Sequence, residues 1–347
     1  MAYPELSERE RRVLEAVIQS YVQTAQPAGS HAIARRFGLG VSPATIRNTM
    51  SDLEEKGMLY HPHTSAGRVP TDVAYRFYVD SLIHLPSSPI KEQQQLTAEI
   101  FAAGNAIEGI LRRAAQSLGV ITQELGIALG PRLDNSILER LDLVRLSSER
   151  ILVALTLAGG SVRTIFIEAK GEVADAALAE VTRLLNERLA GSRLREIRTS
   201  LAERLRDTDP TLGAAELLNV FVEEGEQLID AAMQGEANDV LLGHASVLAE
   251  QPEFASVNNM RRLVALTETR EDLADLLRKR SDVGGITISI GSEHDDPRLD
   301  SFTVVTAQYR AGGLSGVIGV IGPTRMPYEK VISLVTHTSK LITEMME

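Results

Sequence analysis

Apolar residues recur at helical spacing in three short segments of the first 55 residues. A capping box, Ser7-Glu8-Arg9-Glu10, opens the first segment, whose apolar positions return every three or four residues. Residues 27–30 (PAGS) end that helix, and a second short helix stops at residues 38–40 (GLG). A serine suited to the N-cap and a proline suited to the first helical position open a third helix over residues 42–55. The pattern predicts three consecutive helices.

A short strand and a polar loop follow the third helix. Residues 58–60 (MLY) have strand character, and residues 61–67 form a polar loop that ends in glycine. A second strand starting at Arg68 would complete a β-wing. We therefore predict a winged helix-turn-helix domain over residues 1–83; a three-helix protein-binding module is the alternative interpretation.

The third helix has two chemically different faces. Ile46, Met50 and Leu53 form an apolar stripe, and the opposite face carries short polar groups and one arginine. Arginine pairs with guanine O6 and N7, and asparagine pairs with adenine N6 and N7. We therefore predict that Arg47 and Asn48 are the main base-reading residues. The expected DNA contacts of this region are Ser42, Ala44, Thr45, Arg47, Asn48 and Ser51, with Arg35 from the second helix.

The predicted wing adds a second group of candidate DNA contacts. Short hydroxyl side chains and a basic residue suit contacts with phosphate or with the minor groove. An ordinary hairpin tip without contacts is the alternative. The expected wing contacts are His63, Thr64, Ser65 and Arg68.

Further along, the helical pattern continues with one interruption. Residues 71–83 predict a helix whose aromatic side chains, Tyr75, Phe77 and Tyr78, favour packing over base stacking. Residues 84–90 contain the sequence HLPSSP and predict a linker. Residues 91–129 then predict a long helical stretch with a near-heptad apolar rhythm, which suits either a dimer seam or a core helix.

The remaining chain alternates between strands and helices. Three antiparallel strands are predicted from residue 140, helices over 172–248 and 257–280, and a closing helix over 328–346. Later strands are predicted at residues 285–290, 302–308 and 314–321. Strands, a helical interruption and then more strands of the same sheet indicate an inserted domain within an α+β protein. We place this insertion at residues 172–250.

Two long motifs, one near each end of the chain, resemble the HrcA family of bacterial heat-shock repressors. Residues 27–80, from PAGSHAIARRFGLG through SPATIRNTMSDLEEKGMLYHPHTSAGR to YRFYVD, are similar to its N-terminal domain. Residues 312–326, GGLSGVIGVIGPTRM, are similar to its C-terminal signature. One departure is Thr49, beside the predicted reading face, where the family pattern has glutamate.

The resemblance implies both an architecture and a mode of regulation. It implies a GAF-like α/β domain from residues 91–171 and 251–347, interrupted by a mostly helical inserted dimerising domain at residues 172–250. It also implies a dimer on an inverted-repeat operator upstream of chaperone genes, with repression at normal temperature and release on heat shock. Chaperonin would be a partner that keeps the repressor active.

Charge is divided unevenly along the 347 residues. Residues 1–80 hold nine basic and nine acidic side chains, so the whole net charge of −11 falls on residues 81–347. Long-range attraction of this chain to DNA should therefore be weak, and binding must depend on local arginines. Joining two copies multiplies effective affinity, so the charge distribution favours a homodimer.

Composition limits the location and the chemistry. The chain has no cysteine, no apolar leader and no stretch long enough to cross a membrane, which predicts a cytoplasmic protein. Together with the predicted DNA binding, this location implies association with the nucleoid. Phosphate-loop and dinucleotide motifs do not occur, and Gly313-Leu314-Ser315-Gly316 falls short of a nucleophile elbow. His61-Pro62-His63 and residues 293–296 (EHDD) are weak metal candidates that suit solvated loops better. We therefore expect no enzyme activity, no cofactor and no metal.

A metabolite-responsive winged-helix repressor is the alternative function. A GAF-like sheet can hold a small ligand, and a polar set inside its strands would be the sign of one. Arg163, Thr287 and Ser289 are the candidates, although their alternation is also that of ordinary outward-facing strand residues.

Overall fold

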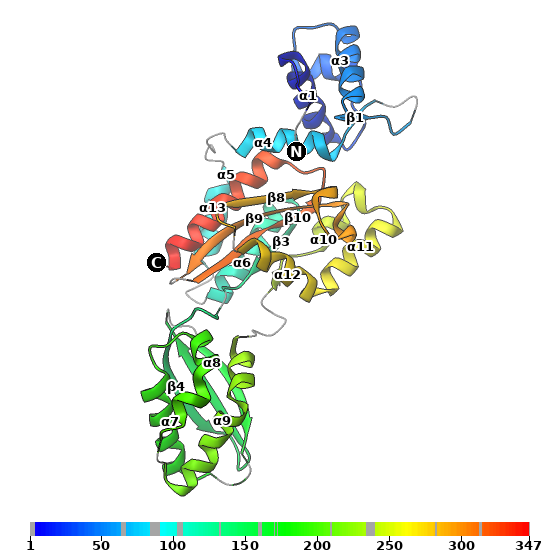
Figure 1. The fold of residues 1–347 in the computed structure, drawn as a ribbon. Helices are drawn as coiled ribbons and strands as arrows, with labels where there is room; N and C mark the ends of the chain where they lie inside the picture. Colours follow the sequence, from blue (N-terminus) through cyan, green and yellow to red (C-terminus); the bar gives the residue numbers. More distant parts are fainter. Residues whose placement is uncertain are drawn as a thin grey trace. The chain divides into compact units, whose positions relative to one another are not determined.

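In the computed structural model of the protein, the helices and strands fall into two compact units (Figure 1). The first unit holds residues 1–129, 240–308 and 317–341, and the second holds residues 130–239, 309–316 and 342–347. Helices and antiparallel sheets are combined, as expected of an α+β protein. The structure describes residues 4–63, 67–83, 91–102, 107–131, 133–158, 162–169, 171, 173–208, 210–233, 240–281, 283–311 and 314–346.

The first unit begins with an N-terminal module, which we define as residues 4–83. Its elements are α1 (Glu8–Thr24), α2 (Ser30–Phe37), α3 (Pro43–Glu55), β1 (Leu59–Tyr60), β2 (Val69–Pro70) and α4 (Asp72–Ile83). The capping box is confirmed: the Glu10 amide donates to Ser7 Oγ at 3.3 Å, and the Ser7 amide donates to Glu10 Oε2 at 2.7 Å. Strands β1 and β2 pair antiparallel, so a two-stranded hairpin follows three helices as predicted. In α4, Tyr75 and Tyr78 are buried, which confirms their packing role.

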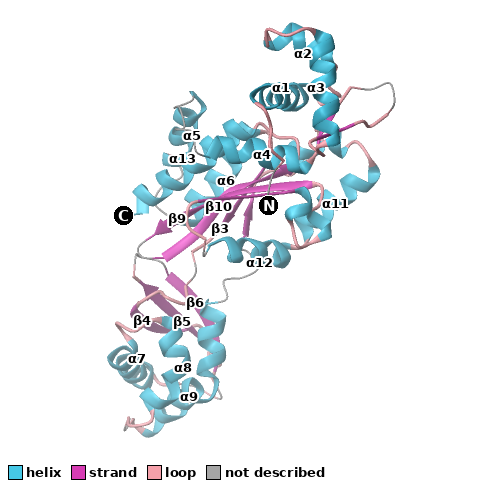
Figure 2. Ribbon diagram, turned by 45° about the horizontal axis from the view of Figure 1, so that its top comes forward, coloured by secondary structure: helices cyan, strands magenta, loops and turns pink. Residues whose placement is uncertain are grey.

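A five-stranded sheet forms the rest of the first unit, with strand order β7-β3-β10-β9-β8. Figure 2 shows α12 on one face of the sheet and α5, α6 and α13 on the other. Strands β3 and β10 lie inside the sheet and are buried at nearly every position, because both of their faces are covered. The strands are β3 (Leu125–Leu129), β7 (Val240–Leu242), β8 (Ile286–Ile290), β9 (Phe302–Ala311) and β10 (Leu314–Pro323). The helices are α5 (Lys91–Phe101), α6 (Ile107–Thr122), α10 (Ser246–Ala249), η2 (Pro252–Phe254), α11 (Val257–Glu268), α12 (Arg270–Ser281), η3 (Gly291–Glu293), η4 (Pro297–Leu299) and α13 (Tyr328–Met346).

Helix α6 lies unusually close to strand β3. A Cβ added at Gly126 would lie 1.7 Å from the carbonyl oxygen of Ala115 and 3.1 Å from the amide nitrogen of Gly119. Only glycine fits where the helix backbone rests on the strand backbone. Any larger residue at position 126 would push α6 off the sheet.

Two predicted helical stretches are wrong at their ends. Residues 91–129 divide into α5, α6 and strand β3, and residues 172–248 contain strand β7 near their end, before the start of α10. These two strands pair with each other, with Ile127 opposite Leu242. Both are short apolar runs, which period alone does not distinguish from buried helix, and the pairing of distant segments decides their structure.

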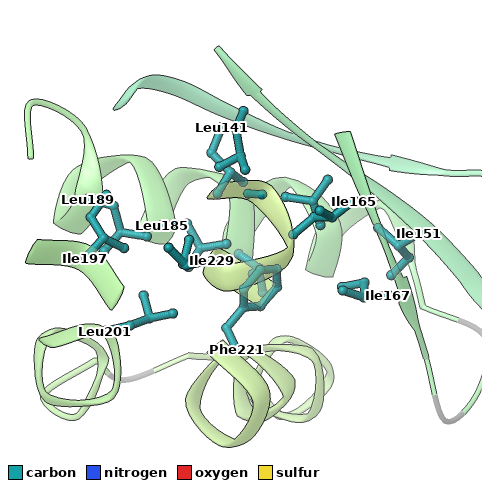
Figure 3. Close-up of a cluster of buried hydrophobic side chains, with 14 of the residues drawn as sticks. Leu141, Ile151, Ile165, Ile167, Leu185, Leu189, Ile197, Leu201, Phe221 and Ile229 are labelled. Atoms are coloured by element: carbon teal, nitrogen blue, oxygen red, sulfur yellow. The ribbon is translucent and has the colours of Figure 1, made fainter. Parts of the chain in front are cut away.

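The second unit is a three-stranded sheet covered on one face by helices. Its order is β4-β5-β6, with antiparallel pairing throughout. Apolar side chains from the strands meet those of the helices in one core, and Figure 3 shows Leu141, Ile151 and Ile165 facing Leu185 and Phe221. The elements are β4 (Leu138–Arg145), β5 (Arg150–Leu157), β6 (Val162–Glu168), α7 (Asp175–Leu189), α8 (Leu194–Leu205) and α9 (Leu212–Met233).

The predicted boundaries of the insertion are therefore corrected. The strands from residue 140 do not join the sheet of the later strands; they form their own sheet with α7, α8 and α9. The expected insertion covered residues 172–250, whereas the second compact unit contains residues 130–239 together with residues 309–316 and 342–347. The physical reason is visible in β5, whose buried positions alternate with half-buried ones, because a sheet with one covered face buries every second residue.

Removing the carboxylate of Glu10 is expected to destabilise the N-terminal module at neutral pH. A hydrogen bond from Lys56, with further bonds from Ser7, lowers the pKa of Glu10 from 4.5 to about 2. A lowered pKa in the folded state adds stability that is complete above the unfolded pKa and is lost as the pH falls through the folded one. Glu10→Gln should lower the free energy of unfolding by about 1 kcal/mol at pH 7, as for loss of a helix cap.

Urea titrations followed by circular dichroism measure this effect. The difference between Glu10→Gln and the wild type should shrink as the pH falls from 4.5 towards 2. Glu8→Gln is the matched control, because Glu8 is an exposed carboxylate in the same helical turn. Equal losses in the two variants, or a difference that does not depend on pH, would contradict the assignment.

Candidate nucleic-acid interface

Helix α3 packs one face against the other helices of the N-terminal module. Ile46 and Leu53 are fully buried and Met50 is 3% exposed, which confirms the predicted apolar stripe. Thr49 is also buried, at 1% exposure, and its hydroxyl donates to the carbonyl of Thr45 at 3.1 Å. Thr49 therefore belongs to the packed face of the helix and not to its solvent face.

The opposite face of α3 is open to solvent. Arg47, Asn48 and Ser51 are exposed there, together with Ser42 and Ala44 at the start of the helix. Thr45 is half-buried because it belongs to the cap: its amide donates to Ser42 Oγ at 3.1 Å, and the two hydroxyl oxygens lie 2.9 Å apart. Arg35 is exposed in the last turn of α2. The expected residues of α3 thus share one solvent face, with Thr45 at its margin, and Arg35 is exposed on the neighbouring helix α2.

The hairpin is fastened to the last turn of α3 by one carboxylate. Glu54 Oε2 lies 2.7 Å from Arg68 Nη2, and Glu54 Oε1 lies 2.7 Å from His61 Nδ1. Arg68 and His61 come from the two sides of the hairpin, so Glu54 holds both sides to the helix. The sequence analysis did not identify this role of Glu54 and His61, because nothing in their spacing signals it.

A pair of backbone hydrogen bonds between Ala28 and Arg68 also holds the second strand side of the hairpin. The Arg68 amide donates to the Ala28 carbonyl at 2.9 Å, and the Ala28 amide donates to the Arg68 carbonyl at 2.8 Å. A Cβ added at Gly67 would lie 2.4 Å from the Ala28 oxygen, so glycine is required for this close approach. The sequence alone placed Gly67 at the end of the polar loop and gave no sign of this contact.

These contacts change the interpretation of the wing residues. Arg68 is only 14% exposed in its side chain and is paired with Glu54, so its guanidinium is engaged within the module, and its contact with DNA stays a prediction. His63 is exposed. Thr64 and Ser65 lie outside the described residues. Of the expected wing contacts, the structure describes His63 as accessible and Arg68 as a residue that joins the hairpin to α3.

The polar set considered for a ligand does not come together in one sheet. Arg163 lies in β6 of the three-stranded sheet, whereas Thr287 and Ser289 lie in β8 of the five-stranded sheet. Arg280 already uses both β8 residues: its Nη2 donates to Ser289 Oγ at 2.6 Å and its Nη1 to the Thr287 carbonyl at 3.4 Å. Burial lowers the pKa of Arg280 to about 10. Within the described residues, no three His, Asp or Glu side chains converge as a metal site would require.

The chain is similar over most of its length to proteins of one family. The family model described as the HrcA protein C-terminal domain matches residues 108–332. A heat-inducible transcription repressor HrcA from Chlorobium phaeobacteroides (strain BS1) is 42% identical, with 97% of each chain covered. The chain belongs to the HrcA family. A protein of the same description from Geobacter sulfurreducens is 37% identical, with 99% of each chain covered.

Family membership assigns the chain to the transcription repressors, and a solved structure supports its fold. Transcription repressors are not a class of enzymes. A crystal structure of a hypothetical protein at 2.2 Å resolution has a TM-score of 0.64 at 23% identity, covering 98% of this chain and 100% of that one, which supports the fold alone. In the part of the chain that the structure describes, no helix combines the length and apolar character needed to cross a membrane.

The pairing of Arg68 with Glu54 should be measurable as a coupling free energy. The pair is largely shielded from solvent, so a double-mutant cycle of Arg68→Ala and Glu54→Ala should give about 1 kcal/mol of coupling in urea unfolding. The exposed pair Arg183 and Glu187 in α7 is the control, with an expected coupling of about 0.3–0.5 kcal/mol. Coupling near zero for Arg68 and Glu54 would mean that the hairpin is not held through this contact.

Proposed function

We propose that this protein is a sequence-specific DNA-binding repressor of heat-shock chaperone operons, built around a winged helix-turn-helix module. The observation that carries the proposal is that α3 has a buried apolar face and an exposed polar face. Ile46 and Leu53 are buried. The exposed residues are Arg47, Asn48 and Ser51. Arginine and asparagine can form the bidentate contacts that distinguish base pairs in the major groove. Family membership supports the same role, since the relatives are named heat-inducible transcription repressors.

We also propose that this protein is regulated in the way that its resemblance to the HrcA family implies. The repressor binds an inverted-repeat operator as a dimer, is released on heat shock, and is kept active by chaperonin. It acts in the cytoplasm, in association with the nucleoid. The GAF-like domain would be the five-stranded sheet with its helices, and residues 130–239 would be the inserted dimerising domain. These boundaries replace those expected from sequence.

Arg47 is expected to read a base, whereas Arg35 contacts phosphate. The probe is a duplex selected by the wild-type protein from a random pool, compared with the same duplex mismatched at each half-site. Arg47→Ala should lose roughly 1–3 kcal/mol on the selected duplex and little on the mismatched one, measured by fluorescence anisotropy. Arg35→Ala should weaken both duplexes and reduce the salt slope by about 0.9.

The two arginines control for each other, because both are exposed and lie on neighbouring helices. Loss of binding to both duplexes in Arg47→Ala, with a reduced salt slope, would make Arg47 a phosphate contact and contradict its assignment. Failure of the wild-type chain to select any sequence would contradict the proposed function itself.

Dimerisation is supported by the uncovered face of the three-stranded sheet in the second unit. One cross-strand row on that face is apolar: Val144 is opposite Leu152, which is opposite Phe166. Val144 is 46% exposed and Phe166 is 56% exposed, although the other face of the same strands is buried in the core. Apolar rows of this kind are typical of surfaces that a second molecule covers. This row lies beside the turn between β4 and β5, and an exposed row of this kind can pair with its own copy about a twofold axis.

Phe166→Asp should convert the dimer to a monomer. A buried carboxylate facing its own copy costs desolvation and repulsion on both sides of the interface, so it should abolish association at micromolar concentration. Sedimentation velocity measures the change, and Val257→Asp is the control, because Val257 is 74% exposed in the other unit. Affinity for the inverted repeat should fall while affinity for a single half-site stays unchanged. A dimeric Phe166→Asp protein would exclude this face as the interface.

The metabolite-responsive alternative gains no support from the described residues. Ser289 and Thr287 are engaged by Arg280, and Arg163 belongs to a different sheet. A ligand at β8 would have to displace the Arg280 guanidinium from its hydrogen bonds.

A further inference from the structure

Helix α4 of the N-terminal module is attached to the edge strand of the five-stranded sheet by one arginine. Arg76 Nε donates to Glu293 Oε1 at 2.6 Å, and Arg76 Nη2 contacts Glu293 Oε2, which makes the pair bidentate. The same Nη2 donates to the Ile288 carbonyl at 2.7 Å. Strand β8 is the last strand of this sheet among the described residues, so this carbonyl lies at the edge of the sheet. The side chains of Arg76 and Glu293 are only 16% and 22% exposed, so solvent screens the pair weakly.

One turn earlier in α4, Asp72 makes a second contact with the same region. The Ser292 amide donates to Asp72 Oδ2 at 3.0 Å. Gly291 has a φ of +49°, and a Cβ added there would lie 2.2 Å from Asp72 Oδ2. Glycine is therefore needed both for the backbone conformation and for the close approach of Asp72. Two residues separated by one helical turn hold α4 at two points, which restrains its rotation as well as its distance.

A third contact lies at the end of helix α1. Arg325, between β10 and α13, donates from Nη1 to the Val22 carbonyl at 2.7 Å and from Nη2 to Glu253 Oε2 at 2.9 Å. Close by, the rings of Tyr75 in α4 and Tyr328 in α13 lie 5.7 Å apart between centroids. We call the contacts of Arg76, Asp72 and Arg325 the latch. They join two different helices of the N-terminal module to the sheet domain.

We propose that the latch sets the orientation of the DNA-reading module on the sheet domain, so that Arg76 and Glu293 are positioning residues for the spacing of operator half-sites. The inference rests on the proposed function. A dimeric repressor recognises an inverted repeat only if its two reading helices are held at the separation of the half-sites. A tether without directional contacts would accept many separations and lose effective concentration at each of them. Bidentate, shielded arginine–carboxylate pairs supply the directional contacts.

The test compares Glu293→Ala with Asp295→Ala in the full chain. Both variants remove one carboxylate from the same loop, but Asp295 is exposed and lies outside the latch contacts. Inverted repeats of the selected half-site are prepared with spacers that increase by single base pairs over one helical turn. Wild type and Asp295→Ala should bind best at one spacing. Glu293→Ala should lose about tenfold at that spacing, bind the other spacings nearly equally, and bind a single half-site as the wild type does.

Hydrogen exchange provides a readout that needs no DNA. The Ser292 amide is protected by Asp72, so an open latch should expose it. In Arg76→Gln, exchange at Ser292 should be at least about tenfold faster than in the wild type, whereas Asp295→Ala should leave it unchanged. Wild-type protection of Ser292 in Arg76→Gln, or a sharp wild-type spacing optimum in Glu293→Ala, would overturn the proposal. If the wild type selected no DNA, the proposed function would fail, and the exchange result would still decide whether Arg76 closes the latch.

Discussion

Burial of the five-stranded sheet on both of its faces is the constraint on which the rest of the architecture depends. Strands β3 and β10 have almost no exposed position, so helices must cover the sheet on each side. The three-stranded sheet has only one covered face and forms a core of its own with α7, α8 and α9. The chain leaves the five-stranded sheet after β3, forms this separate core, and returns to the five-stranded sheet at β7.

Carboxylates that serve more than one partner join the elements of the first unit. Glu10 caps α1 and also binds Lys56 just beyond α3. Glu54 holds both sides of the hairpin, and Glu293 holds Arg76 while accepting the Ile290 amide at 2.8 Å. Each carboxylate has two oxygens and can satisfy a charged partner and a second donor together. These pairs therefore join separate elements, and loss of Lys56 would leave the buried carboxylate of Glu10 without its charged partner.

Pairing of charges within the fold also bears on how an acidic chain could present the proposed DNA-reading surface. Arg68 is paired within the fold, and the exposed arginines of α2 and α3 lie beside short polar side chains. The N-terminal module is neutral as a whole, so specific contacts and the doubling of sites in a dimer would supply the affinity that general attraction does not. An orientation held by the latch would then be as important for binding as any single contact.

Local signals in the sequence determined the N-terminal module and the later strands. A capping box, a serine–proline helix start and a 3.6-residue apolar rhythm depend on neighbours within a few residues, so the three helices, the hairpin and the polar face of α3 follow from them. The spacing of apolar residues likewise predicted strands β8, β9 and β10 and helix α13. Family motifs at both ends of the chain pointed to the HrcA family before any contact was known, and the family match confirms it.

Tertiary structure decided what depends on distant residues. Residues 125–129 are an apolar run that could extend a helix, and they become a strand because residues 240–242 and β10 pair with them. Arg68 has a side chain suited to a DNA contact, yet its guanidinium forms an ion pair with Glu54 at 2.7 Å. The latch joins residue 76 to residue 293, a separation that no local pattern encodes. Sequence determines the preferences of each segment, but pairing across hundreds of residues is settled only when the folded chain brings the partners within hydrogen-bonding distance.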